Sequence, residues 1–201
     1  MAKLLPHSPT LVSLTDLADI ISGLTPAKRE EGTADSIQVI QVGDLIEATD
    51  EVRPITALNW ATVIPGTSID RSKVQTGDVL VSCKGTIGRL GLVGPETQDA
   101  VATSNLLIAR PKEGVKPTTL LAILKSERAQ QFFQSRARGG AIQSLSFRDL
   151  EALEVPPIEA LPQNQLKELL LSHAASVKAT GEAVKARGKL TSTLLEQTIW
   201  G

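Results

Sequence analysis

The sequence predicts an α+β fold, in which a twisted mixed sheet with short helices is followed by one long C-terminal helix. Short runs rich in β-branched and apolar residues, such as 78–83, lie between Gly- and Asp-containing turns and are typical of strands. Apolar residues recur at helical spacing over 117–138. Proline is absent after Pro162, and 163–199 is therefore interpreted as one helix of about 37 residues.

The N-terminal third begins with an expected short amphipathic helix. Ser13 or Thr15 is its predicted N-cap, and Gly23 its stop. Trp60 is expected to lie in the core. The sequence predicts a helix at 11–21 and a polar loop at 23–36. A strand at 37–42 and two short irregular strands at 52–60 and 62–65 follow.

The next part of the chain is predicted to alternate strands with helical segments. Pro117 stands near the first turn of the expected helix. Ser146, with Asp149 three residues later, resembles a capping box. The expected strands lie at 78–83, 90–93, 102–110 and 153–155, and Gly139-Gly140 is expected to end the helix.

The composition of the chain argues against several classes of function. At 201 residues the chain fits one domain, or one domain with an appendage. An aromatic content of 2% argues against stacked aromatic platforms for sugars or single strands. We expect no secretory signal and no membrane span, and hence a cytoplasmic protein. Cys83 is expected to be a buried strand thiol, and the widely separated His7 and His173 predict no metal site and no cofactor.

Charge is divided unevenly along the chain. Residues 1–70 hold four Lys/Arg and ten Asp/Glu, a net −6, whereas 71–150 hold twelve and six, a net +6. Because phosphate contacts need local positive charge, the basic half favours a surface for a polyanion. Chance clustering is the alternative interpretation.

The stretch from Val74 to Val93 is the one around which the chain is organised, and it contains the loop Lys84-Gly85-Thr86-Ile87-Gly88-Arg89. Its two glycines allow backbone N–H groups to approach a ligand, and its two cations add charge. It therefore indicates a loop that faces a phosphate backbone or a base edge. A glycine hairpin with solvated ends is the other interpretation.

Further polar residues have two interpretations each. Ser104 and Asn105 can cap a turn or read a base, and Arg136 and Arg138 suit either a helix C-terminus or phosphate. The C-terminal helix needs a partner for its apolar stripe, although Gly181 and Gly188 interrupt it. The predicted dimerisation residues of that stripe are Leu166, Leu170, Val177, Val184, Leu194 and Leu195.

The order of these segments resembles the specificity (S) subunit of type I restriction–modification systems. The resemblance rests on GDVLVSCKGTIGRLGLV, then ATSNLLIARP, then RARGGAIQSLSFRDLEALEVPPIEALPQNQ and a long helix. It implies a target recognition domain that binds one half of a split DNA site, and a helix that sets the distance to the other half. Catalysis in that family belongs to separate methyltransferase and motor/nuclease subunits. One such domain and one helix make this chain similar to a half-subunit.

We therefore expect a non-catalytic DNA-recognition module, with a recognition domain at 1–158 and a dimerisation and spacer helix at 159–201. Its expected partners are double-stranded DNA, the methyltransferase subunits, the motor/nuclease subunit, and a second copy paired through antiparallel helices. The alternatives are pairing with a different half-subunit, or a natural or engineered truncation. The rival interpretations are a cofactor-binding methyltransferase and an adaptor that acts through its helix alone. The candidate DNA contacts are Lys84, Arg89, Arg136 and Arg138 for phosphate or guanine, and Thr86, Ser104, Asn105, Gln143 and Ser144 for base edges.

Overall fold

The structure is a computed structural model that describes residues 10–27, 36–138, 143–179 and 184–200. Its largest sheet has six strands in the order β2-β10-β7-β8-β5-β4. Strands β5 and β8 run parallel, and the other neighbours in this sheet are antiparallel. In sheet order the strands are Ala18–Ser22, Leu106–Pro111, Val79–Ser82, Leu90–Leu92, Glu51–Val52 and Leu45–Ile46.

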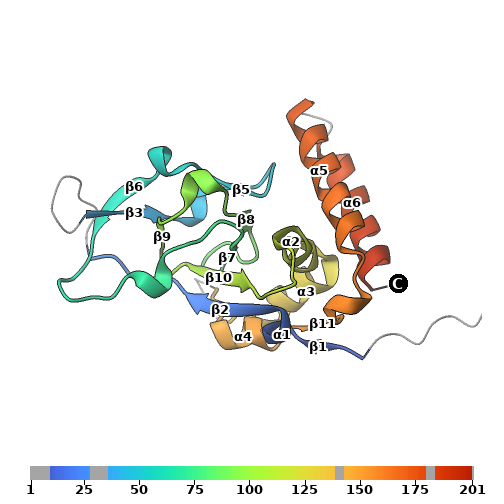
Figure 1. The fold of residues 1–201 in the computed structure, drawn as a ribbon, viewed down its shortest axis with the longest axis horizontal. Coiled ribbons are helices and arrows are strands. Elements are labelled where there is room, and N and C mark those ends of the chain that lie inside the picture. Colours follow the sequence, from blue (N-terminus) through green and yellow to red (C-terminus); the bar gives the residue numbers. More distant parts are fainter. Residues whose placement is uncertain (1–9, 28–35, 139–142, 180–183, 201) are drawn as a thin grey trace, which may run out of the picture.

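Two smaller sheets complete the β structure. One pairs β1 (Val12–Ser13) with β11 (Glu154–Val155). The other has the order β6-β3-β9, formed by Asn59–Thr62, Ser36–Ile40 and Val101–Ala102. This three-stranded sheet lies at the opposite end of the molecule from the C-terminal helices (Figure 1).

Six α-helices are described, together with short 3₁₀ turns at 42–44, 55–57, 70–72, 95–97 and 158–160. Helices α2 and α3 lie between the large sheet and the C-terminal helices, whereas α1 and α4 lie beside β2 (Figure 1). The bounds of α1 to α6 are Leu14–Leu17, Pro117–Lys125, Glu127–Arg136, Phe147–Glu151, Gln163–Ala179 and Val184–Ile199.

Strands β7 and β10 are buried on both faces. Val79, Val81 and Leu107 face the core beneath the helices, whereas Leu80 and Ile108 face the core shared with the small sheet. Side chains alternate between the faces of a strand, so a central strand covered on both sides is apolar throughout. This explains why the run at 79–81 is continuously hydrophobic, and the sheets and helices together confirm the predicted α+β class.

The predicted N-terminal helix is wrong for most of its length. Only Leu14–Leu17 is helical, and Ala18–Ser22 forms β2, which pairs with β10. The cap was predicted correctly, because the Ser13 and Asp16 side chains complete a capping box. Pairing with the central strand β10 overrides the helical spacing of the apolar residues after Leu17.

Two further predictions are corrected. The helix expected over 117–138 is two helices, because Ser126 is extended with ψ 148° and its side chain caps α3. Trp60 is not a core residue, since 37% of its surface is exposed on β6. Strand β6 is an edge strand of its sheet, and its first two residues, Asn59 and Trp60, are both exposed.

The single long C-terminal helix is also wrong. Helices α5 and α6 form an antiparallel hairpin that packs against α2 and α3 (Figure 1). Leu195 and Ile199 of α6 lie in the same core as Leu166 of α5. Burying one such side chain stabilises by about 1.5–3 kcal/mol, more than the roughly 1 kcal/mol by which a glycine weakens a helix interior. Folding back therefore buries an apolar stripe that an extended helix would leave in water.

The predicted dimerisation residues lie in different places on this hairpin. Leu166, Leu170 and Leu195 are buried inside the chain, whereas 38% of Leu194 is exposed. The side chains of Val177 and Val184 lie outside the described residues. The division into 1–158 and 159–201 stays a prediction, because the hairpin shares its core with the preceding part of the chain.

Candidate nucleic-acid interface

Three segments that are far apart in the sequence meet at one end of the large sheet. The Cys83 N–H donates to the Asn105 carbonyl at 2.8 Å, and the Leu145 N–H donates to the Cys83 carbonyl at 2.8 Å. The Gly85 N–H donates to the Gln143 carbonyl at 3.1 Å. Because β7 and β10 are antiparallel neighbours, the end of one lies beside the start of the other.

We call the exposed side chains of these segments the rim. Its cations and polar groups come from the loop after β7, the residue before β10 and the chain around the end of α3. Ser104, another predicted contact, is half-buried beside it. The exposed rim residues are Lys84, Thr86, Asn105, Arg136, Arg138, Gln143 and Ser144.

The third segment is closed by a two-way backbone pairing. The Arg138 N–H donates to the Ser144 carbonyl at 2.9 Å, and the Ser144 N–H donates to the Arg138 carbonyl at 2.8 Å. The predicted Gly139-Gly140 helix stop lies outside the described residues. The pairing nevertheless fixes where Arg138 and Ser144 leave the body of the protein.

The loop at 84–89 is held from inside by Ser82. Its hydroxyl donates to the Thr86 carbonyl at 2.5 Å and accepts the Arg89 N–H at 2.8 Å. Both loop glycines have positive φ, +75° at Gly85 and +85° at Gly88, a region that side chains other than glycine rarely enter. The loop therefore has a defined shape that leaves Lys84 and Thr86 exposed.

Helix α3 holds the same loop from outside. The Gln130 side-chain amide donates to the Gly88 carbonyl at 3.2 Å, and that of Gln134 to the Ile87 carbonyl at 3.3 Å. A Cβ on Gly88 would lie 2.6 Å from Gln130 Oε1, so the loop and the helix are in close contact. Sequence reasoning missed both glutamines; their i,i+4 spacing on one helix face was the available signal.

Arg89 has a different position from the other predicted contacts. Its side chain is partly buried, and Nη2 donates to the Leu45 carbonyl at 2.7 Å. Its Nε is buried without a hydrogen-bond partner in the described part of the chain. Arg89 therefore links the loop to β4 and does not join the exposed rim.

Positive charge at the rim is partly offset by one carboxylate. A hydrogen bond from Ser146 lowers the pKa of Asp149, and the nearby charges of Arg138 and Arg136 lower it further. Asp149 also closes the predicted capping box with Ser146, which is confirmed. The Arg136 guanidinium lies 5.1 Å from the centre of the Phe132 ring, a cation–π contact that orients it.

The described residues give little support to thiol or metal chemistry. Burial raises the pKa of the Cys83 thiol to about 11, which confirms a buried thiol and disfavours a thiolate nucleophile. The described residues contain no group of three or more His, Cys, Asp or Glu placed to hold a metal ion. None of the described helices is long and apolar enough to cross a membrane.

Solved structures share this fold. The chain aligns over its full length with the HsdS subunit from Thermoanaerobacter tengcongensis, with a TM-score of 0.61 and 18% identity, covering 47% of that subunit. A chain of another type I R-M system gives 0.58 with 17% identity over 100% of this chain and 48% of its own. The S subunit from M. genitalium gives 0.53 with 16% identity over 85% of this chain and 39% of its own. The fold is that of a type I specificity subunit.

A curated relative gives the same result at the level of sequence. The EcoBI specificity subunit of a type I restriction enzyme from Escherichia coli is 25% identical over 171 residues, which cover 83% of this chain and 35% of that protein. No family model matches the chain. The predicted resemblance to specificity subunits is therefore confirmed, and the chain spans less than half the length of these relatives.

Proposed function

We propose that this chain is the sequence-recognition subunit of a type I restriction–modification complex, and that it binds one half of a bipartite DNA site. The observation that carries the proposal is the rim, where three separate segments bring three exposed cations and several amides and hydroxyls to one edge of a specificity-subunit fold. Cations suit phosphate, whereas amides and hydroxyls suit base edges.

In this proposal the rim residues divide by chemistry. Lys84, Arg136 and Arg138 contact phosphate or guanine. Asn105 and Gln143 present a backbone-anchored amide to a base edge. The remaining base-edge candidates are Thr86, Ser104 and Ser144.

The chain itself is non-catalytic in this account and is assigned to the cytoplasm. Methylation is carried out by DNA methyltransferase subunits and cleavage by a motor/nuclease subunit. Its relatives are named as specificity subunits, which supports this division of roles.

We further propose that two copies form a homodimer through the C-terminal segment, residues 159–201, with residues 1–158 as the recognition domain. The chain spans less than half of its relatives, so two copies would supply two recognition domains. The hairpin keeps apolar surface on its outside, since Leu171 is 51% exposed and Leu194 is 38% exposed. A two-fold pair would present identical surfaces to two half-sites.

Mapping DNA methylation in cells with and without this chain tests the function. We expect a bipartite motif that is methylated only when the chain is present, with identical half-sites related by two-fold symmetry. Identical methylation in both strains would contradict the recognition role. A motif with unlike halves would contradict the homodimer alone.

The mass in solution tests the homodimer separately. Two copies give a mass near twice 21.3 kDa. Replacing Leu171 and Leu194 by Ser should shift the protein toward the single-chain mass. A single-chain mass for the unmodified protein at micromolar concentration would contradict the dimer.

A further inference from the structure

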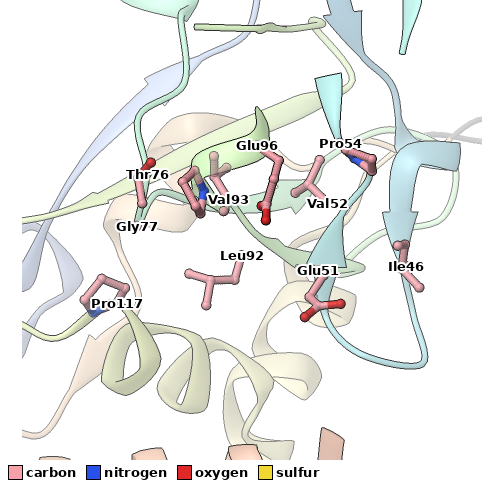
Figure 2. Close-up of a pocket in the computed structure, with 12 residues that line it drawn as sticks. Ile46, Glu51, Val52, Pro54, Thr76, Gly77, Leu92, Val93, Glu96 and Pro117 are labelled. Carbon is pink, nitrogen blue, oxygen red and sulfur yellow. The ribbon is translucent and has the colours of Figure 1, made fainter. Parts of the chain in front are cut away.

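A groove away from the rim lies between the edge of the large sheet and the start of α2. It has a volume of about 690 Å³. Figure 2 shows Leu92 of β8 at its centre, Val52 and Glu51 of β5 on one side, and Pro117 of α2 on the other. Glu96, from the turn after β8, points its carboxylate into the same space (Figure 2).

The walls of the groove are held in place by backbone contacts. The Gly77 N–H donates to the Val93 carbonyl at 2.9 Å, and the Val93 N–H donates to the Asp78 carbonyl at 2.9 Å. Gly77 has φ +95°, and a Cβ there would lie 2.9 Å from Pro117 Cγ. Helix α2 therefore starts directly against the glycine turn, and the groove exists before any ligand arrives.

The exposed Glu96 side chain passes close to Gly94. A Cβ added at Gly94 would lie 2.9 Å from Glu96 Oε2. Gly94 has φ −87°, an ordinary conformation for any residue. A side chain at this position would therefore affect only the neighbouring Glu96 carboxylate. The glycine thus leaves room for the carboxylate beside the groove.

Charge sets the groove apart from the rim. Its lining includes two carboxylates, Glu51 and Glu96, and no Lys or Arg. DNA phosphate would be repelled here, whereas a cation would be attracted. The remaining lining is largely apolar, with the half-buried Leu92 and Pro117 available to a hydrocarbon side chain.

We propose that this groove is a docking site for a protein segment in which an apolar side chain is adjacent to Lys or Arg. The apolar side chain packs on Leu92 and Pro117, and the cation pairs with Glu96. Such a partner is a protein and not a nucleic acid, because the Glu96 carboxylate repels phosphate and the apolar lining suits a hydrocarbon side chain. The groove is separate from the rim, so an experiment can disprove peptide binding in the groove without disproving DNA binding at the rim, and the reverse.

Peptide selection on the full-length chain tests the proposal. Random peptides of about 12 residues displayed on phage would be selected on the immobilised chain, long enough to cover an open groove. We expect enriched sequences that place Lys or Arg within a few positions of a large apolar residue. Failure to enrich any sequence, or enrichment of acidic sequences, would overturn the proposal.

Variants then locate the bound peptide. One enriched peptide would be synthesised and its affinity measured by fluorescence anisotropy. Glu96→Gln should weaken it about two- to fivefold, the size expected for losing one solvent-exposed ion pair. Circular dichroism shows whether the variant is folded. Glu159→Gln, a matched loss of an exposed carboxylate outside the groove, should leave the affinity unchanged.

Competition separates the groove from the rim. Duplex DNA should not displace the peptide. Equal affinities for the unmodified chain and Glu96→Gln, or displacement by DNA, would overturn the docking site. Neither result would bear on DNA recognition.

Discussion

Replacing Lys84 by Gln removes one of the three exposed cations of the rim. Each phosphate contact releases condensed counterions, so the logarithm of the affinity falls with the logarithm of salt concentration by about 0.9 per contact. Three contacts per chain predict a slope of about −2.7, and two contacts predict about −1.8. Between 50 and 200 mM salt, the affinity of one chain should fall about 40-fold, and that of the Lys84→Gln chain about 12-fold.

The assay is fluorescence anisotropy of a labelled duplex titrated with the chain at four or more salt concentrations. Lys167→Gln is the matched control, because Lys167 is an exposed lysine on α5, away from the rim. Arg89→Gln should keep the slope and instead lower the unfolding free energy by about 1 kcal/mol, because its guanidinium donates to the Leu45 carbonyl.

Equal changes in slope for Lys84→Gln and Lys167→Gln would refute the rim as the DNA-facing surface. A slope near zero for the unmodified chain would refute phosphate binding itself and would favour the adaptor hypothesis. We expect a smaller slope for Lys84→Gln alone and a clearly negative slope for the unmodified chain.

Three other predictions concern stability and reactivity. Because burial raises the pKa of the Cys83 thiol to about 11, iodoacetamide at pH 8 should label it slowly in the folded chain and quickly in urea; fast labelling of both would contradict this. Burial, and then the charge of Lys125, lower the pKa of His173 below its usual 6.5. The unfolded chain therefore binds that proton more readily, and stability should fall as the pH drops through about 6.5, a change that His173→Gln should abolish. Asp78→Ala leaves Arg110 without its 2.8 Å ion pair and should lower the urea unfolding free energy by about 3 kcal/mol; a loss below about 1 kcal/mol would show that the pair is dispensable.

Local signals in the sequence predict the turn at 84–89 and the cap at Ser146, two of the backbone features that shape the rim. The glycines of the loop at 84–89 and the cap at Ser146 act through neighbouring backbone atoms, so their effect is visible in a short window. Lys84 lies in a turn and Arg138 follows a helix end. Turns and helix ends usually lie at the surface, and both side chains are exposed.

Features that depend on distant partners were not predictable in this way. Arg89 has the same local context as Lys84, but the Leu45 carbonyl, 44 residues away, takes its guanidinium. Residues 18–22 have a helical pattern, yet their pairing with β10 makes them a strand. Trp60 was assigned to the core from its apolar character alone, and its place on β6 leaves it 37% exposed.

The C-terminal segment shows the same limit. Its apolar stripe was interpreted as a surface for a second chain, because such a stripe must be covered. The cover turned out to be α2 and α3 of the same chain, with Leu195 and Ile199 in the shared core. A periodic pattern shows that a face is buried but does not identify what buries it.

Sequence-specific DNA binding is the central claim, and selection from random duplex DNA tests it most directly. The full chain should enrich a short motif. Asn105→Ala or Gln143→Ala should alter that motif, whereas Lys84→Gln should weaken binding to all sequences alike. Recovery of DNA without any preferred sequence would contradict the claim.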